Sequence, residues 1–202
     1  MNRAARYCLL VGICVWAYAP LSAQTAQDRD LQRFWIHLNL GYGTANVSCD
    51  SCASGPRLDG ATYGIELGGT VSPSVRLGGL FEAWTHQVGD ATEDMENVGL
   101  VMYYYPSVSS GLFLKGSVGY ASYHASGFPA IDGTGWGYLG GLGYEFPIGS
   151  SVTLMPFADY VVGNVGELDF SDGSGAFATG WKQNFVAVGL SFGFYPSRRH
   201  RY

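Results

Sequence analysis

The clearest pattern in the chain is an alternation of large apolar and small residues near its C-terminal end. Residues 185–194 read FVAVGLSFGF, and every second side chain from Val186 to Phe194 is large and apolar. The positions between them carry only alanine, glycine and serine. Because the side chains of a strand alternate between its two faces, the segment predicts a strand with one wholly apolar face. Small residues on the other face favour a closed membrane barrel with lipid outside and a filled interior.

Seven earlier segments show the same alternation. We predict strands at residues 34–44, 61–71, 75–86, 97–105, 112–123, 134–146, 151–162 and 185–194. Each has roughly the ten residues that a tilted strand needs to cross a bilayer. Long and short connections alternate, as in barrels with short periplasmic turns and long outer loops, here including an acidic loop at 88–96 and a long loop at 163–183. The prediction is an all-β protein, an eight-stranded antiparallel up-and-down transmembrane β-barrel.

The charged residues of these strands fall on the face with the small residues, which would be the lumen. The predicted lumen polar network consists of His37, Glu66, Arg76, Glu82, Lys115, Glu145 and Asp159. Charges in so narrow a space must be paired and hydrogen-bonded. Because an eight-stranded interior is just wide enough for side chains to fill, we favour a plug of salt bridges. The alternative is a lumen that conducts protons, ions or small solutes.

Aromatic residues on the apolar face fall into two groups, one near each rim. The inner group is Phe34, Tyr104, Phe146 and Phe194, and the outer group is Tyr42, Tyr63, Tyr120, Trp136 and Tyr160. Such rings suit the two interfaces of a membrane.

Pro156 is the exception to the strand pattern. Proline has no N–H to donate, and a closed barrel has no free strand edge where that donor is not needed. We therefore expect a bulge near Met155–Pro156.

Composition supports an exported membrane protein. Only 13% of the 202 residues are charged, against about a quarter in typical soluble domains, while 15% are aromatic and 30 residues are glycine. The formal net charge of −5 argues against nucleic acid as a partner, since phosphate binding needs a basic surface.

The N-terminal residues have the anatomy of a cleavable signal peptide. Arg3 and Arg6 precede an uncharged, mostly apolar run that is too short to span a bilayer as a helix. We predict a signal peptide at 1–23, a periplasmic lead-in at 24–33, the barrel at 34–195 and a basic periplasmic tail at 196–202. A lipoprotein anchor at Cys14 is disfavoured, because Ile13 stands where a small residue is needed. The expected location is the outer membrane of a Gram-negative-type bacterium.

Two cysteines remain after the signal peptide, Cys49 and Cys52, within a polar loop. In an oxidising compartment this pair favours a disulfide that staples the loop. A redox motif would need a helix start near a βαβ pattern, and a zinc site would need two further ligands nearby. Neither context is apparent, and no metal or cofactor is expected.

One possible catalytic pair stands near the predicted outer end of a strand. His124 and Ser126 are two residues apart, and Asp132 is the nearest acid in the sequence. A nucleophilic serine needs a base within reach and a carboxylate that orients the base. The position resembles that of the His and Ser of some eight-stranded outer-membrane enzymes, and this resemblance makes a lipid A-modifying enzyme the second alternative. A polar strand end without catalysis is the preferred interpretation.

The terminal strand also carries a motif, Gly189-Leu-Ser-Phe192-Gly-Phe194, which resembles the assembly signal of small outer-membrane barrels. With the eight-strand layout, it makes the chain similar to the superfamily of OmpA transmembrane domains, OmpX-like proteins and opacity-type porin-family proteins. The resemblance implies insertion by the barrel assembly machinery, contact with outer-membrane lipid and lipopolysaccharide, and loops available to a surface ligand. We expect a structural or surface-interaction role without catalysis, and a monomer, because a closed barrel has no free strand edge that needs a partner.

Overall fold

The computed structural model describes residues 34–52, 55–127 and 129–196. The predicted signal peptide, the lead-in and the tail beyond Pro196 lie outside these residues. No helix among the described residues is long and apolar enough to cross a bilayer.

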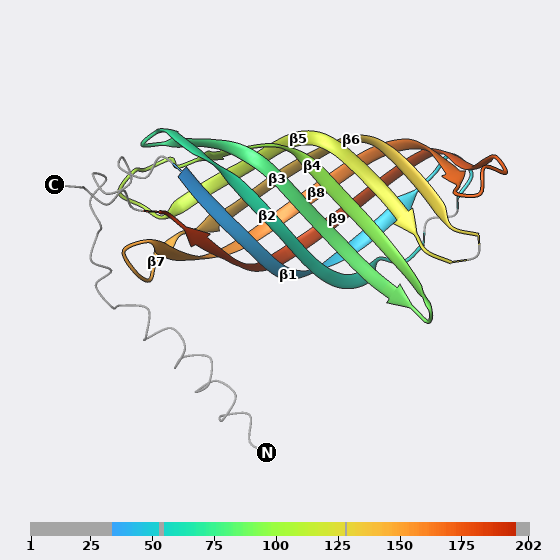
Figure 1. The fold of residues 1–202 in the computed structure, drawn as a ribbon, viewed down its shortest axis with the longest axis horizontal. Helices are drawn as coiled ribbons and strands as arrows, with labels where there is room; N and C mark the ends of the chain where they lie inside the picture. Colours follow the sequence, from blue (N-terminus) through green and yellow to red (C-terminus); the bar gives the residue numbers. More distant parts are fainter. Residues whose placement is uncertain (1–33, 53–54, 128, 197–202) are drawn as a thin grey trace, which may run out of the picture.

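The described chain forms a closed antiparallel barrel (Figure 1). The strands are β1 (Phe34–Ser48), β2 (Leu58–Ser72), β3 (Val75–Val88), β4 (Ala91–Tyr104), β5 (Leu112–Ala125), β6 (Ile131–Tyr144), β7 (Phe146–Pro147), β8 (Val152–Phe170) and β9 (Ala176–Phe194). Sequential strands pair as neighbours, β6 pairs with β8, and β9 pairs with β1 to complete the ring. Because β7 is a two-residue segment against β8, the ring consists of eight long strands, as predicted.

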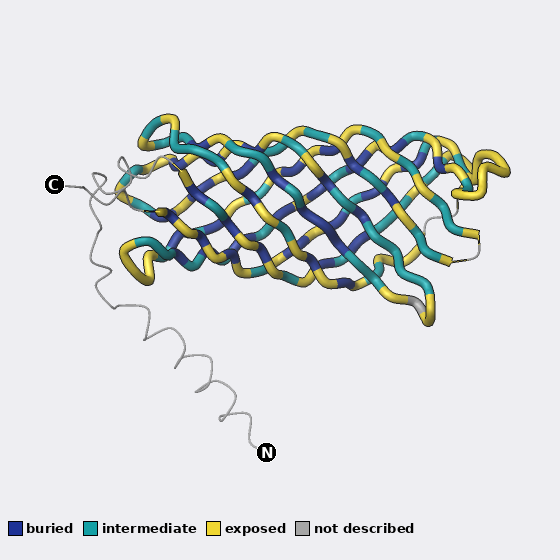
Figure 2. Tube along the Cα trace, viewed as in Figure 1, coloured by how far each residue is buried: buried dark blue, intermediate teal, exposed yellow. Residues whose placement is uncertain are grey.

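Buried positions alternate with more exposed ones along most of the long strands (Figure 2), although Glu82, Ala83 and Trp84 of β3 are buried in succession. The outward positions are large and apolar, and Leu100 is 72% exposed and Leu40 61% exposed. Soluble monomers rarely expose a continuous apolar surface of this extent. The outward face is therefore the surface of a barrel that lipid surrounds.

The two aromatic groups lie on this outward face. We call the end of the barrel near Phe34 and Tyr195 the inner end, and the opposite end the outer end. Toward the outer end, Tyr120 and Trp136 stack with their ring centroids 5.3 Å apart, and both are more than half exposed. Side chains of this kind favour the boundary between hydrocarbon and water.

The strands are longer than the predicted membrane-crossing segments, so two predicted loops are wrong. Residues 88–96 belong largely to a β3–β4 hairpin whose strands end at Val88 and begin again at Ala91. Most of 163–183 extends β8 and β9, which leaves only residues 171–175 between them. The part of a strand that extends beyond the membrane needs backbone pairing but no apolar face, so acidic residues can stand in this part of the strand. Outward positions there include Asp94 and Glu96, which corrects the expectation that strand charges point only inward.

The bulge expected at Met155–Pro156 is also wrong. Inward and outward positions alternate without interruption from Thr153 to Val165. Gly143 pairs with Phe157 and Phe146 pairs with Leu154, so the register is the same on both sides of Pro156. The proline lies at the gap between β6 and β7, where the ladder to β8 is interrupted. Because Pro156 has no N–H, it cannot donate to the ladder at this point. The alternation of inward and outward positions nevertheless continues past it, and Asp159 still faces inward.

Candidate functional site: the barrel interior and its outer rim

The interior of the barrel holds all seven residues of the predicted lumen network, each no more than 5% exposed. Lys115 is central to one group. Its Nζ donates to Glu66 Oε1 at 3.0 Å and to Asp159 Oδ2 at 2.6 Å. Glu66 also accepts from Asn39 Nδ2 at 2.8 Å and from the hydroxyl of Tyr103. This one group of carboxylates around an ammonium thereby joins side chains from five strands, β1, β2, β4, β5 and β8.

A second charged group lies nearer the inner end. Arg76 Nη2 is 3.2 Å from Glu145 Oε2, and Arg76 also donates to the hydroxyl of Tyr195. The guanidinium lies 4.6 Å from the ring centroid of Tyr105, whose hydroxyl donates to Glu145 at 2.9 Å. The structure brings Arg76 and Glu145 together and directs Lys115 to the other carboxylates.

His37 lies between the two charged groups. Its Nδ1 is 3.3 Å from the hydroxyl of Tyr103 and 3.6 Å from Glu66 Oε2, and its Nε2 is 3.2 Å from the hydroxyl of Tyr195. The fully buried ring of Trp35 stacks on His37 at a centroid distance of 4.5 Å. Polar and aromatic side chains therefore form one continuous packed layer across the interior.

Sequence reasoning named the charged members of this layer and missed its aromatic donors. Tyr103, Tyr105 and Tyr195 are each no more than 2% exposed and all contact the charged groups. Their position in the inward phase of the alternation was the signal that could have identified them. A tyrosine on the lumen side of a barrel strand brings a hydroxyl that must find a partner.

The outer rim brings together His124, Asp132 and Ser171. The imidazole Nδ1 of His124 and the hydroxyl of Ser171 both contact the carboxylate of Asp132. These two contacts, with Ser171 contributing most, lower the pKa of the Asp132 carboxyl. Ser126, by contrast, bonds the backbone of Thr92, accepting from its N at 2.7 Å and donating to its O at 3.2 Å.

This arrangement differs from the one that a serine nucleophile requires. In a Ser–His–Asp triad the histidine lies between the serine and the carboxylate. Here the carboxylate of Asp132 lies between His124 and Ser171. A cavity of about 420 Å³ adjoins the group, where the β6–β8 register is interrupted, and its lining includes Glu167 and Asp169.

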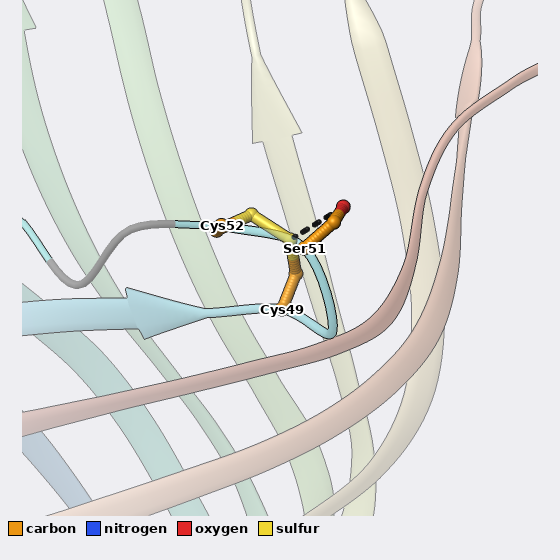
Figure 3. Close-up of a disulfide and its surroundings, with 3 residues drawn as sticks. All are labelled: Cys49, Ser51 and Cys52. Atoms are coloured by element: carbon orange, nitrogen blue, oxygen red, sulfur yellow. Dashed lines mark hydrogen bonds between the residues drawn. A yellow bond between two sulfur atoms is a disulfide. The ribbon is translucent and has the colours of Figure 1, made fainter.

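Cys49 and Cys52 are bonded to each other in the connection between β1 and β2 (Figure 3). The disulfide closes a four-residue turn at the outer end of β1, and Cys52 N donates to Cys49 O at 3.4 Å. It tightens one turn and does not connect distant parts of the barrel.

The residues of the proposed assembly motif lie at the seam between the first and last long strands. Phe192 pairs with Leu38 and Phe194 pairs with Ile36 across β1, and both phenylalanines point outward, about 40% exposed. Gly189 is opposite Gly41, and a Cβ at Gly189 would lie 2.8 Å from the ring of Phe157. The glycine therefore leaves room for a lumen aromatic beside the seam.

Comparison with solved structures identifies the architecture. Neisserial surface protein A superposes with a TM-score of 0.51 at 13% identity, covering 78% of this chain and 95% of that one. The chain has the fold of the small outer-membrane β-barrels. The likeness is one of fold, and the apolar exterior agrees with a barrel that lipid surrounds.

Two further barrels superpose with lower scores. Ail, the attachment invasion locus protein of Yersinia pestis, was solved with the heparin analogue sucrose octasulfate and superposes with a TM-score of 0.49 at 13% identity, covering 80% of this chain and 99% of that one. The outer membrane protein OprG from Pseudomonas aeruginosa superposes with a TM-score of 0.44 at 12% identity, covering 82% of this chain and 98% of that one. No protein-family model matches this chain, and no curated protein sequence matches it either.

Proposed function

We propose that this barrel has a structural or surface-interaction role in the outer membrane, with a lumen closed by its own side chains and without catalysis. The observation that supports the closed lumen is the packing of the interior. Trp35 and Trp84 are fully buried, Tyr103 and Phe113 are 2% exposed, and Met155 is fully buried. Large buried side chains at successive levels support a filled interior, because an eight-stranded barrel is just wide enough for side chains to fill.

The charged side chains inside the barrel support the same proposal. The Lys115 and Arg76 groups each tie together strands from different parts of the ring. A conducting path would have to break these buried ion pairs, and removing one partner from such a pair typically costs about 3–5 kcal/mol. The network therefore stabilises the ring and opposes conduction.

The outer end supplies the surface for interaction. β8 and β9 extend well beyond the aromatic positions and end in a hairpin at residues 171–175 (Figure 1). Acidic side chains there include Asp132, Glu167 and Asp169, which line one cavity. This end would meet lipopolysaccharide headgroups and a ligand outside the cell.

The remaining expectations belong to the same proposal. Gly189, Phe192 and Phe194 would be read by the barrel assembly machinery, because they lie on the strand that closes the ring. The barrel would act as a monomer, since a closed ring leaves no strand edge that needs a partner.

Planar-bilayer recording tests the closed lumen. The purified full-length protein should give no stable conductance steps, whereas Trp35→Ala, which removes a fully buried ring from the interior, should give measurable openings. Trp136→Ala is the matched control, because it removes an outward ring that is 56% exposed, and it should remain silent. Stable steps in the wild-type barrel would instead favour the narrow channel.

A further inference from the structure

Glu82 differs from the other carboxylates of the interior. It is 1% exposed, and neither of its oxygens accepts a hydrogen bond from any described residue. The other three, Glu66, Glu145 and Asp159, each have a cationic side chain within 3.2 Å. None of the ion pairs among the described residues includes Glu82. Its carboxyl is therefore buried with neither a cation nor a hydrogen-bond donor from the described chain.

The charged groups that act on Glu82 disfavour a negative charge there. Lys115 of β5 attracts the carboxylate, whereas Asp159 of β8 and Glu66 of β2 repel it. The ammonium of Lys115 already donates to Glu66 Oε1 at 3.0 Å and to Asp159 Oδ2 at 2.6 Å. Its single positive charge thus serves two carboxylates, and a third ionised carboxylate in the same group would be uncompensated.

The two adjacent strands supply no compensation at this level. The cross-strand partner of Glu82 is Gly64 on β2 and Asn97 on β4, and neither residue carries a charge. A Cβ at Gly137 would collide with Asn97 Oδ1, so the amide of Asn97 is directed toward β6, and it makes no hydrogen bond with Glu82. An ionised carboxylate here would have lost its water without gaining a donor, and such burial is far more costly for an ion than for a neutral group.

We propose that Glu82 holds a proton in the folded barrel at neutral pH, so that folding of this chain takes up a proton from solution. A buried carboxyl without a compensating partner gives up its charge by binding a proton. Glu66 and Asp159 keep their charges, because both accept hydrogen bonds from Lys115. Glu82 is thus a pH-sensitive group built into the interior, and it is independent of the proposed surface role because it lies inside the barrel.

A proton held at Glu82 makes the stability of the barrel depend on pH in a definite direction. In an unfolded chain an exposed glutamate ionises with a pKa of about 4.3. Above that pH the unfolded chain has lost a proton that the folded barrel keeps, so stability falls as the pH rises. This one group increases the unfolding equilibrium constant by about tenfold per pH unit for as long as the folded barrel holds the proton.

Urea unfolding of the detergent-solubilised full-length barrel between about pH 5.5 and 7 tests this dependence. Glu82→Gln keeps the shape of the side chain without a titratable group. Its unfolding equilibrium constant should rise with pH less steeply than that of the wild type, by about a factor of ten per pH unit. Glu96→Gln, which removes a carboxyl from an outward position on β4, should keep the wild-type slope. Equal slopes in the wild type and Glu82→Gln would overturn the proposal.

Infrared spectroscopy detects the proton itself and gives an answer even where the variant does not fold. The wild-type barrel at neutral pH should show the carbonyl band of a protonated carboxyl. That band should shift when the glutamates carry a heavy carbon isotope, and it should be missing from Glu82→Gln. A wild-type spectrum without a protonated glutamate band, or a band that persists in Glu82→Gln, contradicts the proposal.

Discussion

Lys115 Nζ lies 2.6 Å from Asp159 Oδ2, although the two residues are 44 positions apart in the chain and belong to β5 and β8. These strands are not neighbours in the ring, because β6 lies between them. The ion pair therefore reaches across the interior and does not follow the backbone ladder. It holds together parts of the barrel that backbone hydrogen bonds do not join directly.

We expect Lys115→Met to lower the free energy of unfolding by about 3–5 kcal/mol, because Glu66 and Asp159 would remain buried without their cation. Urea unfolding in detergent micelles, followed by tryptophan fluorescence, measures the change. Lys182→Met is the control, since Lys182 is exposed on β9, and it should leave the midpoint unchanged. Equal midpoints for both variants would show that the buried pair contributes nothing to stability.

Gly141→Ala should destabilise the barrel by about 1–3 kcal/mol, as overpacking of a filled interior does. A Cβ at Gly141 would collide with Asp159 Oδ1, on the carboxylate that Lys115 holds. Gly140→Ala is the matched control on the adjacent, outward position, where a Cβ would meet no atom within 4 Å. Thermal unfolding of the two variants side by side tests the difference, and a loss in Gly140→Ala as large as in Gly141→Ala would argue against interior packing as the cause.

Phe194→Ala should reduce the yield of assembled barrel in membranes. Phe194 pairs with Ile36 of β1 and with Val152 of β8, so it supports the seam where the ring closes. Phe177→Ala removes an aromatic ring of similar exposure from the outer hairpin and should assemble normally. The heat-modifiable fraction on SDS gels reports assembly. A wild-type fraction for Phe194→Ala would remove the assembly role of this residue.

Asp132 lies beyond the aromatic positions at the outer end, where pH can act on it directly. Contacts from Ser171 and, second, His124 lower its pKa, so they stabilise the folded state above the ordinary aspartate pKa of about 3.9. That stabilisation disappears as the pH falls through the lowered pKa, when the carboxyl takes up a proton.

Ser171→Ala should raise the pKa of Asp132 toward the ordinary value, as followed by carboxyl-carbon NMR titration. Ser174→Ala should leave Asp132 unchanged and raise the pKa of Asp172 instead, because Ser174 is the main cause of the lowered pKa there. A titration of Asp132 that is the same in Ser171→Ala and wild type would mean that the serine contact does not form in solution.

Much of the architecture followed from alternation alone. The alternation of inward and outward positions within the predicted strands, the closure of the ring by the last strand and the number of long strands were predicted and are confirmed by the fold. Strand ends were predicted less well. A run of acidic residues such as Asp94 and Glu96 is typical of a loop, so the composition predicted one. The structure places both residues in β4, because a hairpin beyond the membrane needs only backbone pairing.

The direction of a side chain, inward or outward, is what the sequence by itself determined here, because a strand has only two faces and each face meets one environment. Tertiary structure decided which inward residues meet. Oblique strands (Figure 1) shift each strand along its neighbour, and that shift sets the level at which a side chain enters the lumen. Lys115 therefore meets Asp159 and Glu66, Arg76 takes Glu145, and Glu82 is left without an ionic partner among the described residues.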